Sequence, residues 1–515
     1  MTTGPASSPA PCETNTIIAF ADSALALGVL REVKSLAEQL AARTGALRFD
    51  ELPSDVIDRA KCCVLDQLGV QLLGASLPVM HPAVALARFA GAAPAVSRMA
   101  CLGERVSAPY AALVGAALGH SCEFDDCHFD CGHPGSCVIP SALAVGDQVH
   151  ADGRRFLAGL VAGYEAMVLA IGPVHHSFAS TGWQGTKIGG VFGAAATAAH
   201  LLGLGQDQAA HAIAIAGAEA SGTLEYDRSG GQAKRFYPAL AARSGIEAAF
   251  LAGAGLTGPL TILEGERGIF RLFGDGTSRF DNIWSASFHI RNAFFKLNPA
   301  VGTHLAPIQA LTELIAEHGF TASDIEQITV GVAPFAVKHG GDTGRPDDPV
   351  RAQYNVGFSL ALRAVEGRNA VHSYLDPAKW NDPVISHLSE RVVVEAMDLT
   401  PGDSPMGARV SVRLRDGRTV TRRLQTFRGH TGDPADFSDL TQKFRQVTEG
   451  RLPEDRIERI VDTVARLEEL DDIGHLIELT VDRAKAWPSN GDSSRVAVPG
   501  QDPATGERPT DVNSL

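Results

Sequence analysis

The segment from Cys122 to Cys137 contains the densest group of potentially reactive side chains in the sequence. It reads Cys-Glu-Phe-Asp-Asp-Cys-His-Phe-Asp-Cys-Gly-His-Pro-Gly-Ser-Cys and lies between two apolar stretches. Carboxylates and imidazoles can exchange protons with a bound molecule, so Glu123 or Asp126 together with His133 could form an acid–base site. Because so many polar side chains are not expected in a core, we predict that the segment is a loop or a helix end.

The same segment allows two other interpretations. Cysteine, histidine and aspartate all bind metals, but the spacing C-x4-C-x3-C-x5-C contains no C-x2-C pair and matches no usual zinc or iron–sulfur pattern, so we predict no metal. The segment could also be a surface loop whose aspartates cap helices and whose cysteines fill small spaces. The residues alone leave the acid–base, metal-binding and structural interpretations open.

Two further segments contain lysines with unusual neighbours. Lys234 and Arg235 follow a pair of glycines, and such a flexible backbone before two cations suits capture of a carboxylate or phosphate. Lys234 could be desolvated enough to act as a base, or the two residues could be a solvated pair at a helix end. Lys296 lies between two phenylalanines and Leu-Asn-Pro, so it either snorkels to solvent or is a buried cation that awaits an anionic ligand.

A glycine-rich run at 182–193 does not predict a nucleotide site. It contains Gly185-Thr186-Lys187, which reverses the order of the phosphate-binding motif, and no predicted strand precedes it. The sequence also contains no G-x-S-x-G motif, which argues against a common type of hydrolase. We therefore predict that the protein uses no cofactor.

The composition limits the partners and the cellular location. The 515 residues include 45 Lys and Arg against 59 Asp and Glu, and the net charge of −14 disfavours nucleic acid and anionic membranes. No run of 18 uncharged apolar residues appears, so no membrane span is predicted. The eight cysteines, of which Cys62 and Cys63 are adjacent, do not form a secretory pattern, and we expect a cytoplasmic protein.

The elements that must position these residues change in type along the chain. Apolar helical patterns fill 30–290, β-branched stretches at 325–332, 391–395, 408–413 and 418–424 indicate a small α+β domain over 291–428, and helical periodicity returns over 429–487. The helical stretches lack polar faces, which predicts a multi-helix core. Residues 1–29 and 488–515 are predicted to be flexible termini. The fold class is therefore mainly α, with a large all-helical domain and a smaller α+β domain inserted before the C-terminal helices.

Six segments of this sequence occur in an order that is typical of one family. They are Glu123-Phe-Asp-Asp-Cys-His with His133-Pro134; Gly182-Trp-Gln-Gly-Thr with Gly190-Val-Phe-Gly-Ala-Ala; Ser221-Gly222 to Glu225 with Gly231 and Lys234-Arg235; Thr257-Gly258-Pro259 with Glu264-Gly265 and Gly268; Lys296 with Pro299 and His304; and Ala352-Gln353-Tyr354. Together they resemble the MmgE/PrpD family over about residues 30 to 480. That family includes 2-methylcitrate dehydratase, cis-aconitate decarboxylase and iminodisuccinate epimerase.

The resemblance implies that the α+β domain is a lid and that the protein is a homodimer. It places His133, Lys234, Lys296 and His304 on the lining of the family's pocket. Glu123 and Cys127 fall where dehydratase and decarboxylase members have Asp and Thr, and Gln184 falls where they have His. Combining residues and resemblance, the predicted catalytic residues are His133, Lys234, Glu123 and Lys296, and the predicted substrate-binding residues are Cys127, Gln184, His304, Asp126 and Arg235.

These residues predict chemistry next to a carboxylate. Removing a proton or carbon dioxide from a small polycarboxylate leaves negative charge on the substrate, and expelling hydroxide places it on the leaving group; buried cations can stabilise either. We expect a cofactor-independent lyase, a dehydratase or decarboxylase, that acts on a di- or tricarboxylate. One alternative is an isomerase that acts at a carbon beside a carboxylate, as in the epimerase branch. An alternative of another class is a metal-binding or scaffold protein that uses the Cys122–Cys137 segment.

Overall fold

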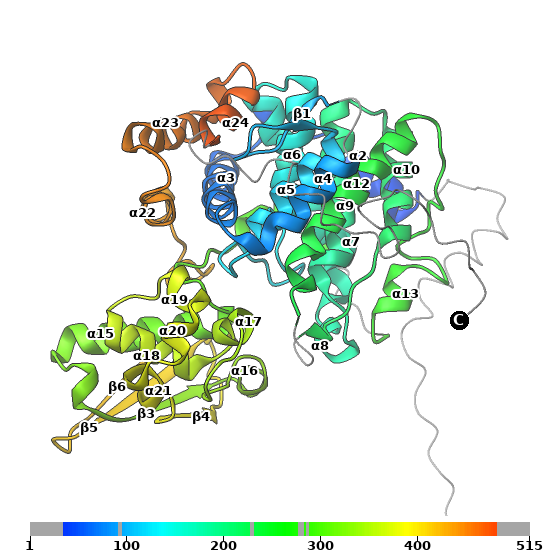
Figure 1. Ribbon diagram of the computed structural model, residues 1–515. Coiled ribbons are helices and arrows are strands. Elements are labelled where there is room, and N and C mark those ends of the chain that lie inside the picture. Colours follow the sequence, from blue (N-terminus) through cyan, green and yellow to red (C-terminus); the bar gives the residue numbers. More distant parts are fainter. Residues whose placement is uncertain (1–33, 91–94, 227–230, 277–282, 285–287, 482–515) are drawn as a thin grey trace, which may run out of the picture.

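The structure is a computed structural model that describes residues 34–90, 95–226, 231–276, 283–284 and 288–481 (Figure 1). The predicted flexible termini, 1–29 and 488–515, lie outside the described residues. Helices dominate the described chain, and the prediction of a mainly α protein is confirmed. Figure 1 shows a helical part and, beside it, a smaller part that contains a β-sheet.

The helical part, here called the helical unit, contains most of the first 290 residues. Its helices are α2 (Leu36–Gly45), α3 (Ser54–Gly74), α4 (His81–Ala90), α5 (Ala108–Gly119), α6 (Gly135–Val149), α7 (Gly153–His175), α8 (Phe178–Thr181), α9 (Gly185–Leu202), α10 (Gln206–Ala216), α12 (Tyr237–Gly253) and α13 (Ile269–Phe273). Two short strands, β1 (Ser97–Arg98) and β2 (Arg105–Val106), pair antiparallel.

Small residues let the central helices of this unit pack closely. The helices α7 and α9 lie against each other, and α9 also contacts α12 and α6. A Cβ atom added at Gly193 of α9 would lie 3.0 Å from Val138 Cγ2 and 3.1 Å from the Gly163 carbonyl oxygen of α7. The high Ala and Gly content of the sequence is therefore used for close helix contacts. By length and composition α7 could cross a membrane, but its apolar stretch is entirely buried within the unit.

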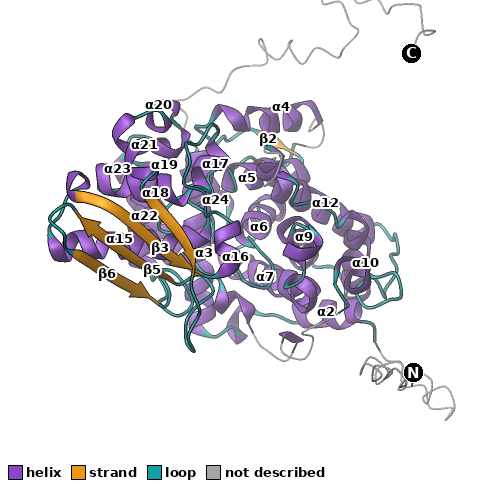
Figure 2. Cartoon of the chain, turned by 90° about the horizontal axis from the view of Figure 1, so that it is seen from below, coloured by secondary structure: helices purple, strands orange, loops and turns teal. Residues whose placement is uncertain are grey.

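The second part, here called the sheet unit, follows residue 300. Its strands are β3 (Ile325–Val332), β4 (Val392–Ala396), β5 (Ala408–Leu414) and β6 (Thr419–Leu424), and its helices are α15 (Leu305–His318), α16 (Pro334–Lys338), α17 (Pro349–Gln353), α18 (Val356–Glu366), α19 (Val371–Leu375), α20 (Pro377–Trp380) and α21 (Pro383–Ser389). The strand order is β4-β3-β5-β6, with β3 parallel to β4 and antiparallel to β5. The turn after Asp416 joins β5 to β6 as the predicted hairpin, and α15 packs against both strands (Figure 2).

The chain then returns to the helical unit through α22 (Phe437–Thr448), α23 (Glu454–Ala465) and α24 (Gly474–Thr480). Buried residues from Ala435 to Ile477 belong to the same apolar cluster as the first 295 residues, whereas Ala300 to Phe427 form a second cluster. The helix α22 packs against α3. A third, small cluster contains Val371 of the sheet unit and Val447 of α22, so it joins the two units.

Candidate active site

The Cys122–Cys137 segment is the loop that connects α5 to α6 together with the first three residues of α6, and it is mostly buried rather than exposed. Twelve of its residues, including Glu123, Asp125 and Asp126, are buried. The expectation that so polar a segment lies outside the core is wrong, and so is the interpretation as a surface loop. The physical reason is that its charged groups find hydrogen-bond and ion-pair partners on elements far away in the sequence, which makes their burial possible.

Glu123 lies between two lysines from distant parts of the chain. Its Oε2 atom is 2.9 Å from Lys296 Nζ, and its Oε1 atom forms an ion pair with Lys234. All three side chains are almost completely buried. Lys234 stands on a 3-10 turn, Ala233–Phe236, before α12, and its ammonium group also lies 5.5 Å from the ring centroid of Tyr354 in the sheet unit. Three of the four predicted catalytic residues therefore meet at one point between the two units.

The backbone of Glu123 is held in an unusual conformation from both sides. Its φ angle is 52°, in the left-handed region that residues other than glycine rarely adopt. On one side, Gln353 Nε2 donates to the carbonyl oxygens of Cys122 (2.6 Å) and Pro299 (3.0 Å). On the other side, Lys443 Nζ donates to the Phe124 carbonyl oxygen and stands 3.9 Å from the Phe124 ring centroid. These contacts stabilise a strained backbone at the centre of the site.

His133, the fourth predicted catalytic residue, belongs to a chain of three groups. Asp125 Oδ2 lies 3.2 Å from His133 Nδ1 and 2.8 Å from His120 Nδ1, and the two imidazole rings are 4.8 Å apart. Sequence reasoning missed both Asp125 and His120. Asp125 lies between Glu123 and Asp126 and nothing local distinguishes it from them, whereas His120, directly after α5, could have been found only by its closeness to the polar segment.

Burial and neighbouring charges set the protonation of this chain. Burial by itself lowers the pKa of His133, but the Cys127 sulfur and the Asp125 carboxylate raise it to about 10. Burial lowers the pKa of His120 to about 3 although Asp125 opposes this. Burial would raise the pKa of Asp125, but His120 and His133 together hold it well below its usual range. At neutral pH the chain therefore contains a protonated His133, an ionised Asp125 and a neutral His120.

The Lys234–Glu123 pair can exchange a proton. Burial lowers the pKa of Lys234 well below its ordinary value, and the charges of Lys296 and Arg235 lower it further. The proton that joins Lys234 to Glu123 is therefore held weakly, and the pair can both give and accept one. His133, as an acid, and this pair, as a base, are the two groups that general acid–base catalysis requires.

Cys127 connects the two parts of the site. Its sulfur lies 3.5 Å from His133 Nδ1, and its backbone exchanges two hydrogen bonds of 2.8 Å with Phe294, two residues before Lys296. This short bridge fixes the segment that carries Lys296 against the loop that carries Glu123.

The other predicted substrate-binding residues have their own partners. Asp126 accepts from the Tyr164 hydroxyl (2.7 Å) and the Gly135 N–H (3.0 Å), while burial, with Asp66 adding, raises its pKa to about 7. His304 contacts the Gly340 carbonyl oxygen (2.7 Å) and Ser359 Oγ (3.1 Å) within the sheet unit. Gln184 caps α9, where its Oε1 atom accepts from the Lys187 N–H (2.6 Å). No contact reported for the described residues joins these three side chains to Glu123, and their substrate-binding roles stay predictions.

Arg235, the last of these residues, lines a cavity that does not contain Glu123. Its side chain is buried, and the cavity, of about 570 Å³, is enclosed by both units. Its role also stays a prediction.

One group of side chains in the described part of the chain has the spacing of a metal site. It consists of His120, Asp125 and His133, whose possible ligand atoms lie within 4.8 Å of one another. None of the cysteines of the Cys122–Cys137 segment belongs to it. His120 Nδ1 lies 2.8 Å from Asp125 Oδ2 and can donate to it, while His133 Nδ1 lies 3.0 Å from the Asp126 carbonyl oxygen and 3.2 Å from Asp125 Oδ2, so each imidazole has an acceptor without an ion.

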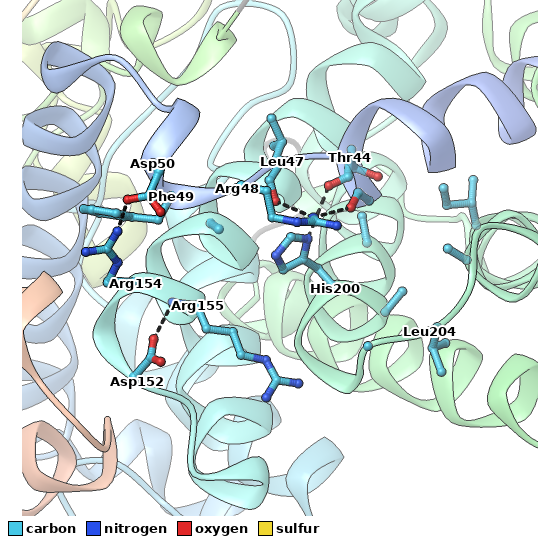
Figure 3. A pocket seen from close by; sticks show the side chains of 17 residues that line it. Thr44, Leu47, Arg48, Phe49, Asp50, Asp152, Arg154, Arg155, His200 and Leu204 are labelled. Atoms are coloured by element: carbon cyan, nitrogen blue, oxygen red, sulfur yellow. Dashed lines mark hydrogen bonds and ion pairs between the residues drawn. The ribbon is translucent and has the colours of Figure 1, made fainter.

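A cavity of about 470 Å³ on the far side of the helical unit contains none of the predicted site residues (Figure 3). Arginine side chains that line it already contact neighbouring acceptors. Arg154 pairs with Asp50, and Arg48 donates to the Gly45 (2.8 Å) and Leu47 (2.9 Å) carbonyl oxygens. The site at Glu123 is therefore the better candidate for chemistry.

Comparison with known proteins agrees with the order of motifs in the sequence. Residues 38–280 match the MmgE/PrpD N-terminal domain and residues 299–469 match the MmgE/PrpD C-terminal domain. The chain is 27% identical over 469 residues to cis-aconitate decarboxylase of Homo sapiens. The aligned region covers 87% of this chain and 95% of that protein. It is 26% identical over 496 residues to cis-aconitate decarboxylase of Aspergillus terreus, and that aligned region covers 89% of this chain and 97% of the relative. The two domain matches together span most of the described residues, and the protein belongs to the MmgE/PrpD family.

Proposed function

We propose that the protein is a lyase that removes water or carbon dioxide from a small di- or tricarboxylate by acid–base chemistry. The observation that carries this proposal is the buried Glu123 carboxylate between Lys234 and Lys296, with protonated His133 nearby. Two buried lysines around one carboxylate provide positive charge that suits an anionic substrate. The family relatives that are named decarboxylases support the same reaction class.

Both lyase reactions create an anion that these residues can stabilise. In a decarboxylation, the carbon–carbon bond to the leaving carboxylate breaks, carbon dioxide departs, and the electron pair stays on the substrate until a proton is added. In a dehydration, a base removes a proton beside a carboxylate, and hydroxide departs with a proton from an acid. In either case Lys234 and Lys296 neutralise the developing charge and His133 gives a proton. Only the dehydration needs a base, and there the Lys234–Glu123 pair takes the proton from the substrate.

The test is incubation of the purified protein with citrate, 2-methylcitrate, cis-aconitate and iminodisuccinate, with products read by mass and chirality. A loss of water or carbon dioxide supports the lyase. An inversion at a carbon with no change in mass would support the isomerase instead. Binding of a stoichiometric metal without turnover of any acid would favour the metal-binding alternative.

We also propose that the sheet unit acts as a lid and that the protein is a cytoplasmic homodimer. The lid is supported by Gln353 and Tyr354, which reach from the sheet unit to the Glu123 centre. The homodimer rests on family membership and the cytoplasmic location on the cysteine pattern. Light scattering of the purified protein and fractionation of the producing cells test these two proposals.

The family resemblance places Glu123, Cys127 and Gln184 where dehydratase and decarboxylase members have Asp, Thr and His. We therefore expect weak turnover of 2-methylcitrate and cis-aconitate. General acid–base assistance contributes about 10²–10⁴ in rate, and Gln184 cannot supply it. The triple variant Glu123→Asp, Cys127→Thr, Gln184→His should raise kcat/KM on these two acids. Efficient turnover of either acid by the unaltered protein would show that the three differences are tolerated.

Activity should persist after exhaustive chelation, because the ring nitrogens of His120 and His133 that face Asp125 already have acceptors within the protein. The measurement is turnover before and after EDTA treatment, together with metal analysis of the protein. If EDTA removes activity and one metal restores it, these three residues become the ligand set.

The rate should depend on the protonation of His133. Its pKa is raised to about 10, so the acid form is present below that pH and is lost as the pH rises through it. We expect kcat/KM to fall on the basic side near pH 10. The His133→Asn variant should lose this limb along with most of the activity, and a limb that persists in this variant belongs to another group.

A further inference from the structure

We propose that a second cavity between the two units binds a small organic phosphate, through three arginines that no carboxylate neutralises. The cavity has a volume of about 490 Å³, and its walls include α3 and α22 of the helical unit and α18 and α19 of the sheet unit (Figure 1). None of Glu123, Lys234 and Lys296 lines it. It is therefore separate from the candidate active site, and this inference is independent of the reaction proposed above.

Three arginines give this cavity its charge. Arg363 belongs to α18, Arg368 follows the end of that helix, and Arg451 follows the end of α22. One carboxylate, that of Glu449, also lines the cavity, so the lining has an excess of two positive charges before His372 is counted. Because the whole chain has a net charge of −14, this excess is a local feature of the cavity.

The three guanidinium groups have no carboxylate partner within 4.0 Å among the described residues. Arg363 donates to Thr312 Oγ1 (2.5 Å) and to the Gly367 carbonyl oxygen (2.8 Å), which are neutral and leave its charge uncompensated. Other arginines of the sheet unit do have such partners, as Arg409 does at 2.7 Å from Glu395. A bound anion can therefore supply the negative charge that the protein does not place here.

Arg451 is the least solvated of these cations in electrostatic terms. Its side chain is half-buried at the junction of the two units, and burial lowers the pKa of its guanidinium group. Moving a cation out of water without a counter-charge is unfavourable. An anion beside Arg451 removes this penalty, so the position favours anion binding.

The buried part of the lining is apolar. Leu73 of α3, Phe124 of the Cys122–Cys137 segment and Val447 of α22 line the cavity and form one buried cluster with Val371 of α19. The volume of the cavity falls within the range of about 300–1,000 Å³ that is typical of small-molecule pockets. A ligand that fills it therefore combines an anionic group for the arginines with a hydrocarbon part for these residues.

A phosphate group matches three arginines better than a carboxylate does. A phosphate monoester has a charge of about −1.5 to −2 at neutral pH and three acceptor oxygens, which can face guanidinium groups on different sides. A carboxylate has one charge and two oxygens in one plane. Because Arg363 and Arg368 belong to the sheet unit and Arg451 to the helical unit, a phosphate that contacts all three joins the two units.

The experiment measures binding of three probes by isothermal titration calorimetry in a phosphate-free buffer. They are inorganic phosphate, phenyl phosphate and phenylmalonate. We expect phenyl phosphate to bind at least about tenfold more tightly than inorganic phosphate, because its ring is buried against the apolar lining. Phenylmalonate has the same ring and two negative charges, and it should bind more weakly than phenyl phosphate because its carboxylates cannot place three oxygens around one point.

Variants locate the phosphate. Arg451→Met and Arg368→Met should each lose at least about tenfold in affinity for phenyl phosphate, as expected for a charge-assisted hydrogen bond. The matched control is Arg445→Met, which removes an arginine of α22 that pairs with Glu454 and does not line the cavity; it should bind within twofold of the original protein. Lys296→Met should also keep the affinity. Thermal unfolding checks that each variant is folded.

Phenyl phosphate affinity that is unchanged in Arg451→Met and Arg368→Met would overturn the site, and a loss in Lys296→Met alone would place the anion at the Glu123 centre instead. Equal affinity for the two phosphates would overturn the apolar contact, and tighter binding of phenylmalonate would overturn the choice of phosphate. A loss confined to Arg368→Met would contradict the link between the units. Failure of the proposed function looks different, because a protein that turns over no acid would still give the expected titrations.

Discussion

Replacing Lys296 or Lys234 by methionine is expected to lower kcat/KM by about 10²–10³ or more for whichever acid the protein turns over, while its melting temperature changes little. Removing one preorganised group that stabilises a developing anion has an effect of this size. Stability is expected to be retained because Glu123 is shared by two cations. When one lysine is removed, the other still neutralises the carboxylate, and the repulsion between the two ammonium groups disappears.

The matched control is Lys379→Met, which removes a partly exposed lysine paired with Glu366 in the sheet unit and should leave kcat/KM unchanged. A second comparison is Glu123→Gln, which leaves two buried cations without a carboxylate and should lower the melting temperature more than either lysine variant. Turnover at the original rate in Lys234→Met and Lys296→Met would show that the chemistry occurs elsewhere.

Replacing Lys443 by methionine is expected to destabilise the protein by about 3–5 kcal/mol, the effect of breaking a buried ion pair from one side. Lys443 Nζ lies 2.5 Å from Asp66 Oδ1, and both side chains are buried. The variant also frees the Phe124 carbonyl oxygen, which follows the strained Glu123. We therefore expect a loss of activity in the fraction of protein that remains folded, measured as kcat per folded molecule.

The pH dependence of this loss distinguishes its cause. Burial raises the pKa of Asp66 to about 6 even though Lys443 opposes the increase. Without Lys443 the folded-state pKa rises further above the unfolded value of about 3.9, so the buried carboxylate takes up a proton in the folded state. The destabilisation should therefore grow as the pH rises from about 5 to 8. Urea unfolding at both pH values measures it.

A double variant provides the control. Lys443→Met with Asp66→Asn leaves no unpaired buried charge and should recover much of the lost stability, because a buried pair removed as a whole costs little. Its activity should stay low, since the Phe124 carbonyl oxygen still lacks its donor. Full recovery of both properties would mean that Lys443 does not position Glu123.

Regular structure followed closely from local patterns. The β-branched stretch 325–332 is strand β3 over the predicted residues, and the turn at Asp416-Gly417 joins β5 to β6. Side-chain shape and glycine geometry act within a few residues, so such patterns can be interpreted without the rest of the chain. The long apolar stretches predicted buried helices for the same reason.

Burial of the polar segment could not be predicted in this way. Whether Glu123 and Asp125 face water or the interior depends on Lys234, Lys296 and His120, which lie between 5 and 173 residues away along the chain. No pattern within the segment itself predicts those partners. The missed role of Asp125 and the wrong expectation of an exposed loop have this one cause.

The sequence by itself determined the helical class, the sheet strands, the family and most of the charged groups that carry the chemistry, because these depend on residue type and on order along the chain. Only the tertiary structure decided that two lysines share Glu123, that His133 is linked through Asp125 to His120, and that Arg235 lines a cavity between the two units. These features depend on distances between residues far apart in the sequence. Such distances are set by the packing of the whole chain, and no local pattern encodes them.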